Sequence, residues 1–288
     1  MITPNLVKKT IFAGTTALLL SVAPASHADS IEQALKKQPD EAKARYEYRN
    51  PKETLEFFKI DKGMTVVEAL PGGGWYSKIL LPVLGEDGTL IGADYAQSMW
   101  SNFQFMTPER IEEKKTWVTT WTEQANAWRS EGDALVNAFK FGDLGEDLKG
   151  TADAVLFIRA LHNLNRFEAK GGYFTKALAD TYAVLKVGGL VGVVQHQALE
   201  DRPDEWADGS NGYLKKSKVV EMFESNGFKL IDQTSVNEND QDQANEGDFV
   251  WRLPPTFYGS GEDIERKQQM TAIGESNRMT LLFKKIEK

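Results

Sequence analysis

The segment between residues 64 and 94 constrains the fold of this chain more than any other. A short β-branched run, Met64 to Ala69, leads through a turn of three glycines, residues 72–74, into an apolar stretch that ends at Leu84. A Gly-Glu-Asp-Gly turn follows, and a second apolar run covers residues 89–94. Strand, glycine-rich turn, helix and strand in this order predict a parallel β-α-β unit with the glycines at the carboxyl end of its first strand.

The same alternation continues along the rest of the chain. Further strands are predicted at residues 135–139, 154–158, 190–194, 228–233 and 279–284. Further helices are predicted at 31–58, with a break at Asn50-Pro51, and at 108–130, 168–185 and 215–226. Alternating strands and helices favour a parallel sheet with helices on both faces. The last two strands lack a crossover helix, so we expect them to pair antiparallel. The predicted fold class is therefore α/β, with a doubly wound, seven-stranded, mostly parallel sheet.

The first 28 residues have the pattern of a secretory signal peptide. Lys8 and Lys9 precede an apolar run over residues 11–22, and Ser26-His27-Ala28 places small residues where a signal peptidase cleaves. The apolar run is short for a membrane span. We therefore expect export to the periplasm or the medium, a mature chain that begins near Asp29, and no stable membrane insertion after cleavage.

The mature chain, residues 29–288, is expected to form one domain. It begins with a helical segment over residues 29–60. Residues 237–277 separate the last two strands and are too many for a hairpin loop. We interpret them as an insertion on the face that carries the site.

Charge and composition exclude several classes of function. The chain has 34 Lys and Arg against 42 Asp and Glu, a net charge of −8. An acidic protein gains little from releasing phosphate counterions, so no nucleic-acid partner is expected. Without cysteine there are no disulfides, thiolate metal sites or cysteine nucleophiles. The histidines lack the spacing of a metal motif such as His-Glu-x-x-His, so no metal is predicted.

The glycine turn and a later carboxylate together indicate a nucleoside site. Glycine allows a ligand to approach the backbone closely, and the helix that follows presents free N–H groups. Asp94 ends the second strand, 20 residues beyond Gly74. At that spacing a carboxylate is able to accept hydrogen bonds from both hydroxyls of a ribose.

Several motifs resemble exported bacterial proteins of the class I S-adenosylmethionine-dependent methyltransferase family. The resemblance covers about Arg45 to Lys284. Its motifs are Arg49-x-Pro51, Leu55-x-Phe57-Phe58, Gly63-Met64-x-Val66, Glu68, Pro71-Gly-Gly-Gly-Trp-Tyr76, Lys186-Val-Gly188-Gly189 and Val250-Trp251-Arg-Leu-Pro254-Pro255. It implies a Rossmann-like methyltransferase fold with S-adenosylmethionine as the cofactor and methyl donor.

The resemblance also implies roles for individual residues in binding the cofactor. Glu68 would hold the methionine ammonium, Gly72 and Gly74 would line the methionine moiety, and Asp94 would bind the ribose. Asp143 would lie near the adenine amino group. Leu70 stands at the first glycine of the family pattern, acid-x-Gly-x-Gly-x-Gly, and is a departure from it.

His162 is the candidate catalytic base if the methyl acceptor must lose a proton. His162 and His196 each follow a predicted strand, so both are expected on the face of the glycine turn. A capping or core histidine is the alternative for each. Aromatic residues of the late loops could cap an apolar acceptor or could simply pack the insertion: Trp206, Tyr213, Trp251, Phe257 and Tyr258.

The leading hypothesis is a methyltransferase that acts on an unidentified small-molecule or protein acceptor. The segment Arg159 to Asn163 lacks the Asn/Asp-Pro-Pro-Tyr motif of nucleic-acid amino-methyltransferases. The alternative is a catalytically inactive, methyltransferase-like binding protein of the periplasm, because the donor is made in the cytoplasm and Leu70 departs from the pattern. A nicotinamide oxidoreductase is less favoured: Tyr182 and Lys186 have the Tyr-x-x-x-Lys spacing, but the glycine layout differs.

Overall fold

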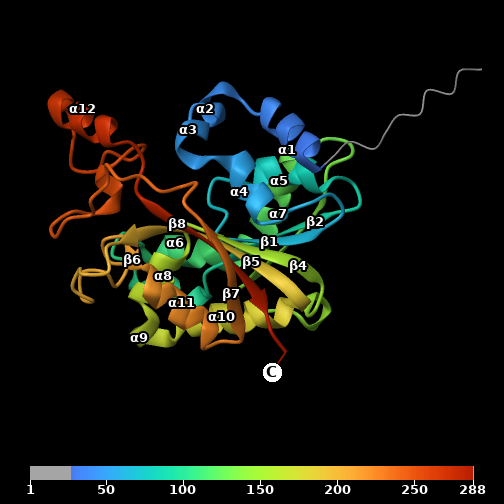
Figure 1. Cartoon of the computed structure of the whole chain (residues 1–288). Helices are drawn as coiled ribbons and strands as arrows, with labels where there is room; N and C mark the ends of the chain where they lie inside the picture. Colours follow the sequence, from blue (N-terminus) through green and yellow to red (C-terminus); the bar gives the residue numbers. More distant parts are fainter. Residues whose placement is uncertain (1–26, 288) are drawn as a thin grey trace, which may run out of the picture.

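A computed structural model describes residues 27–287 of the chain (Figure 1). The predicted signal peptide lies outside the described residues, apart from its last two. Within residues 27–287, no helix has both the length and the apolar character needed to cross a bilayer.

The central sheet has the order β3-β2-β1-β4-β5-β8-β7. Its strands are β1 (Thr65–Ala69), β2 (Thr89–Asp94), β3 (Leu135–Lys140), β4 (Ala152–Ile158), β5 (Leu185–Ala198), β7 (Phe228–Thr234) and β8 (Arg278–Lys285). The first five are parallel, and β8 runs antiparallel to both β5 and β7, as predicted. A further two-residue strand, β6 (Leu214–Lys215), pairs with β5 and was not predicted, because two residues carry no detectable period.

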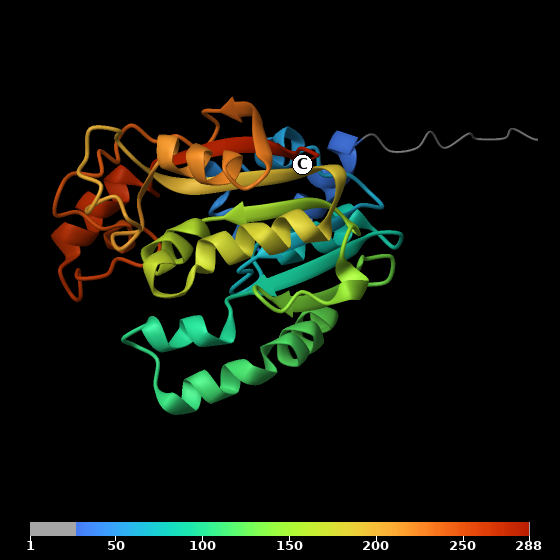
Figure 2. The same ribbon diagram turned by 90° about the horizontal axis from the view of Figure 1, so that it is seen from below.

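Helices cover both faces of the sheet (Figures 1 and 2). One face carries α1 (His27–Lys36), α4 (Pro51–Phe57), α5 (Ser77–Leu84) and α7 (Trp117–Trp128); the other carries α8 (Leu161–Arg166), α10 (Tyr173–Val184) and α11 (Lys216–Glu224). The alternation of side chains along β1 builds both cores, since Val66 packs with the first group and Val67 with the second. This confirms the doubly wound α/β class.

Two helical stretches predicted from the sequence form several shorter helices in the structure, and the break expected at Asn50-Pro51 is present. Residues 31–58 form α1, α2 (Asp40–Lys43), α3 (Tyr46–Arg49) and α4, and residues 108–130 form α6 (Pro108–Glu113), a 3₁₀ turn η2 (Lys114–Thr116) and α7. Asn50 separates α3 from α4, and its φ of 39° lies in the left-handed region. It directly precedes Pro51, and a proline disfavours helical backbone in the residue before it. The remaining short elements are η1 (Gln97–Asn102), η3 (Glu146–Leu148), α9 (Glu168–Gly171), η4 (Val250–Arg252) and α12 (Ile264–Ile273).

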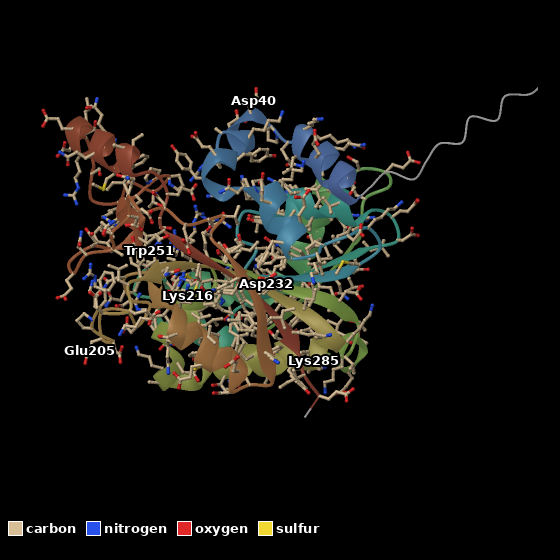
Figure 3. All side chains as sticks on the ribbon, viewed as in Figure 1. Asp40, Glu205, Lys216, Asp232, Trp251 and Lys285 are labelled. Atoms are coloured by element: carbon tan, nitrogen blue, oxygen red, sulfur yellow. The ribbon has the colours of Figure 1, made fainter. Side chains whose placement is uncertain are left out.

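The strand order places a crevice at one end of the sheet. β1 and β4 are neighbours, but the chain leaves β1 toward β2 and leaves β4 toward β5, on opposite sides. Such a switch point opens a ligand crevice outside the carboxyl ends of the strands. The late segment, residues 237–277, lies at this end; it contains η4 and α12, and Trp251, labelled in Figure 3, belongs to it.

A buried polar network attaches the late segment to the sheet. Arg252 Nη1 donates to the Tyr213 hydroxyl at 2.9 Å, and that hydroxyl donates to Asp242 at 2.9 Å. Arg252 Nη2 also pairs with Asp242 at 2.9 Å, while the backbone N–H of Asn277, just before β8, donates to Asp242 at 3.0 Å. Because the members are buried and satisfied, the network holds this wall of the crevice in one position.

Candidate functional site

A cavity of about 450 Å³ lies at the switch point. The loop after β1 lines it with residues 70–73 and Trp75, and the end of β4 and the turn beyond it add Ile158, Arg159 and His162. Arg49 and His196 contribute from α3 and β5, and the late segment supplies residues 250, 251, 253–256, 275 and 276. The glycine turn, both candidate histidines and the late segment therefore meet at one place.

The turns after β1 and β4 have matching geometry. The Leu70 N–H donates to Ala93 O at 2.7 Å, and the Arg159 N–H donates to Val194 O at 2.6 Å, so each makes a last hydrogen bond to the flanking strand. Both residues then adopt left-handed backbone, with φ 56° for Leu70 and 58° for Arg159. This conformation costs a non-glycine residue about 1–2 kcal/mol. Strain of this kind clusters at ligand sites, and here it flanks the cavity on two neighbouring strands.

The glycines of the turn have different surroundings. Gly72 lines the cavity with φ 55°, and a Cβ on Gly73 would meet no atom within 4 Å. A Cβ on Gly74 would lie 2.3 Å from the Trp128 ring, which packs over it from α7. Gly74 is thus required for packing at this point, and its role beside the methionine moiety stays a prediction.

Glu68 is buried just behind the glycine turn. Only 4% of its surface is exposed, and the Ser77 hydroxyl donates to its Oε2 at 2.6 Å. Burial raises the pKa of Glu68 to about 8, while the Ser77 hydrogen bond opposes that rise. Glu68 is therefore mostly protonated at neutral pH in the ligand-free protein.

Asp94, the last residue of β2, has a carboxylate oxygen that accepts no hydrogen bond from the described residues. Its Oδ2 is buried and has no hydrogen-bond partner among residues 27–287. The nearest cation is Lys114 Nζ at 3.8 Å, which also lies 4.1 Å from the centre of the Trp100 ring. Burial raises the pKa of Asp94 to about 6, with Lys114 acting in the other direction. A buried carboxylate oxygen without a donor is suited to accept a ligand hydroxyl.

Leu70 and Gly72 line the cavity, whereas the other four predicted cofactor residues, Glu68, Gly74, Asp94 and Asp143, lie outside the set of residues that line it. Glu68 is buried in β1 and Asp94 is buried at the end of β2, while Asp143 is exposed in the turn after β3. The Asp143 N–H donates to Lys140 O at 2.9 Å, which closes that turn. The structure therefore brings part of the predicted set together and leaves the role of Asp143 a prediction.

His162 and His196 lie side by side in the cavity wall, with ring centroids 5.7 Å apart. Burial lowers the pKa of His162 to about 4 and holds that of His196 well below its ordinary value. His162 Nε2 lies 3.2 Å from the Asn163 amide, and its buried Nδ1 has no hydrogen-bond partner in the described part of the chain. His196 Nδ1 lies 2.6 Å from the Ser276 hydroxyl. Both rings are neutral at pH 7, and His162 retains an uncommitted nitrogen.

A cluster of arginines around Glu275 was missed by the sequence analysis. Arg49 Nε lies 3.1 Å from Glu275 Oε1, and Arg278 Nη1 lies 3.2 Å from Oε2. Arg45 bonds to the same carboxylate, and Arg159 Nη1 lies 3.9 Å from it. Burial opposes ionisation of Glu275, but the four guanidinium groups outweigh it and hold its pKa below the ordinary value. No local pattern reveals this cluster, because Arg45 and Glu275, for example, are 230 positions apart.

Comparison with known proteins identifies the fold. No family model matches the sequence, and no curated protein matches it, but solved structures do. One is a chain of the complex between the Haloferax volcanii Trm112 methyltransferase activator and a methyltransferase, with a TM-score of 0.50 and 16% identity over 89% of this chain and 98% of that chain. Another is geranyl diphosphate methyltransferase in complex with S-adenosylmethionine, with a TM-score of 0.51 and 12% identity over 88% and 95%. The structural neighbours are S-adenosylmethionine-dependent class I methyltransferases, and this chain has their Rossmann-like α/β fold.

Proposed function

We propose that the protein is an S-adenosylmethionine-dependent methyltransferase with a small-molecule or protein acceptor. The observation that carries the proposal is the cavity at the switch point, where the glycine turn meets His162 in a methyltransferase fold. Fold alone does not establish a reaction, and the side chains gathered in the cavity are what support this one.

The residues of the site fit the donor. S-adenosylmethionine supplies a methyl group that the sulfonium has already activated, so the protein must mainly hold donor and acceptor in line. Gly72 and Gly73 allow close approach of the donor to the backbone. The unpartnered Oδ2 of Asp94 would accept the ribose hydroxyls.

His162 is the residue that would receive a proton from the acceptor. A base must be unprotonated before the reaction, and the lowered pKa of His162 keeps its ring neutral at physiological pH. The same low value makes it a weak base. His162 therefore suits an acceptor whose proton leaves as the methyl group arrives, rather than one that must be ionised beforehand.

The test is a calorimetric titration of the purified protein with S-adenosylmethionine, S-adenosylhomocysteine and NADH. We expect the first two to bind and NADH not to bind. Asp94→Asn removes the charged acceptor and should weaken donor binding by roughly tenfold or more. Asp87→Asn, an exposed acid in the turn before β2, is the matched control and should bind like the wild type. Binding of NADH instead, or equal affinity in both variants, would refute the donor site.

A binding protein without turnover is the second candidate function. Two observations favour it: Leu70 occupies the first glycine position in a strained conformation, and Lys114 lies beside Asp94. Both functions require donor binding, so only the release of S-adenosylhomocysteine in the presence of acceptor separates them. Export of the protein is part of the proposal, and fractionation of cells that express the full chain would test it.

A further inference from the structure

The cavity carries an excess of positive charge. Four guanidinium groups surround the single carboxylate of Glu275, so the cluster holds three positive charges more than negative ones. The charged side chains that line the cavity itself, among the described residues, are Arg49, Arg159 and Glu275. His162 and His196 add no charge at neutral pH. A cavity lined by an excess of one sign of charge attracts ions of the other sign, here anions.

Arg159 is the member whose hydrogen-bonding capacity is least used. Arg278 donates to Ser276 O at 3.1 Å and to Tyr48 O, and Arg49 donates to both oxygens of Glu275 and lies 4.7 Å from the centre of the Trp75 ring. In contrast, the Arg159 guanidinium makes one ion pair, at 3.9 Å, and no hydrogen bond within residues 27–287. Its side chain is 28% exposed, and it lines the cavity.

The backbone fixes where Arg159 lies. The residue directly follows β4, and its left-handed φ of 58° turns the chain sharply into α8, which carries His162. Arg49, in contrast, is coupled to the glycine turn through Trp75. Both cavity arginines belong to the cluster around Glu275, but Arg49 also contacts the glycine turn, whereas Arg159 adjoins the helix that carries the candidate base.

We propose that the methyl acceptor carries an oxyanion, a carboxylate or a phosphate, that Arg159 binds. This inference rests on the proposed methyltransferase function. A guanidinium presents paired N–H donors that match the two oxygens of a carboxylate or phosphate. Trp251 and Leu253 supply an apolar surface in the same cavity. The acceptor class is thus a molecule with an anionic group and an apolar body, whose reacting atom lies near His162.

The experiment measures anion binding by thermal unfolding of the full chain. Inorganic phosphate and acetate are titrated separately, with sodium chloride added to keep the ionic strength constant, and each series is repeated with S-adenosylhomocysteine. We expect a saturable rise in melting temperature for the wild type with at least one anion, and comparison of the two series distinguishes a phosphate from a carboxylate. Arg159→Gln should weaken the apparent affinity about tenfold or more. Arg159→Lys should retain part of it, because the charge remains without the paired donors.

Arg110→Gln is the control, since it removes an exposed arginine of α6 and should leave anion binding unchanged. Equal anion responses in Arg159→Gln and the wild type would overturn the proposal. So would an Arg159→Gln variant that binds S-adenosylhomocysteine more weakly but 5′-methylthioadenosine normally, because Arg159 would then bind the carboxylate of the donor. A wild type that binds the anion but no donor would refute the methyltransferase function and support the anion site alone.

Discussion

Two groups of buried charge at the carboxyl ends of the strands differ in their partners: an acidic wall of Glu68 and Asp94, which lies outside the cavity lining, and a basic wall of the arginines around Glu275. On the side of β1 and β2, Glu68 and Asp94 are carboxylates with few partners, and burial raises the pKa of both. On the side of β4 and β8, the arginines surround Glu275 and hold its pKa down. The first wall lacks donors, while the second has donors in excess. A ligand that satisfies both must present hydroxyl or ammonium groups to one wall and an anion to the other.

The largest expected effect comes from removing the one acid of the basic wall. Glu275→Gln leaves Arg45, Arg49 and Arg278 without their common counter-charge. Breaking a buried ion pair in this way costs about 3–5 kcal/mol, so we expect a marked loss in the free energy of unfolding by urea. Glu265→Gln, an exposed acid of α12, should change it little.

Added anions test whether excess positive charge is the cause of this loss of stability. If excess positive charge causes the loss, phosphate at constant ionic strength should stabilise the Glu275→Gln variant more than the wild type. A variant as stable as the wild type would mean that the cluster contributes no net electrostatic energy, and the contrast between the two walls would fail.

The contrast also explains what could be predicted from sequence. The acidic wall depends on neighbouring elements, because β1, the glycine turn and β2 follow one another, and their spacing identified Leu70, Gly72 and Asp94 beforehand. The basic wall joins α3, the turn after β4 and the start of β8, segments that become neighbours only after the sheet has formed. Trp251 and Tyr213 were both predicted among the aromatic residues of the late loops. Trp251 lines the cavity and Tyr213 is fully buried, a difference that the sequence alone did not indicate.

The second prediction concerns the acidic wall and the pH dependence of stability. A carboxyl whose pKa is raised on folding binds its proton more tightly in the native state, so stability falls as the pH rises from its unfolded value of 4.5 toward its folded value of about 8. Glu68 should contribute a loss of roughly 2 kcal/mol between pH 6 and 7.5, at about 1.4 kcal/mol per pH unit. Asp94, with a pKa of about 6, is half ionised at the start of this interval and adds a smaller loss there, which the Glu68→Gln variant keeps.

Glu68→Gln should flatten the dependence over that interval. Denaturant unfolding at pH 6 and 7.5 provides the measurement, and Glu86→Gln, an exposed acid in the turn before β2, serves as the control. If the unfolding free energy changes equally with pH in all three proteins, Glu68 ionises with an ordinary pKa, and burial does not set the charge of the acidic wall.

The smallest expected effect concerns Leu70, whose backbone is left-handed like that of Arg159. Leu70→Gly relieves about 1–2 kcal/mol of strain but adds roughly 0.5–1 kcal/mol of backbone entropy and removes a side chain packed against the core. We expect a net change in unfolding free energy within about 1 kcal/mol, together with tighter binding of S-adenosylhomocysteine. Leu70→Ala separates the two contributions, because alanine removes the packing and keeps the strain, and it should be less stable than Leu70→Gly. If the alanine variant is the more stable of the two, the turn after β1 is not strained in solution. The left-handed backbone at Arg159 would then have no strained counterpart at Leu70.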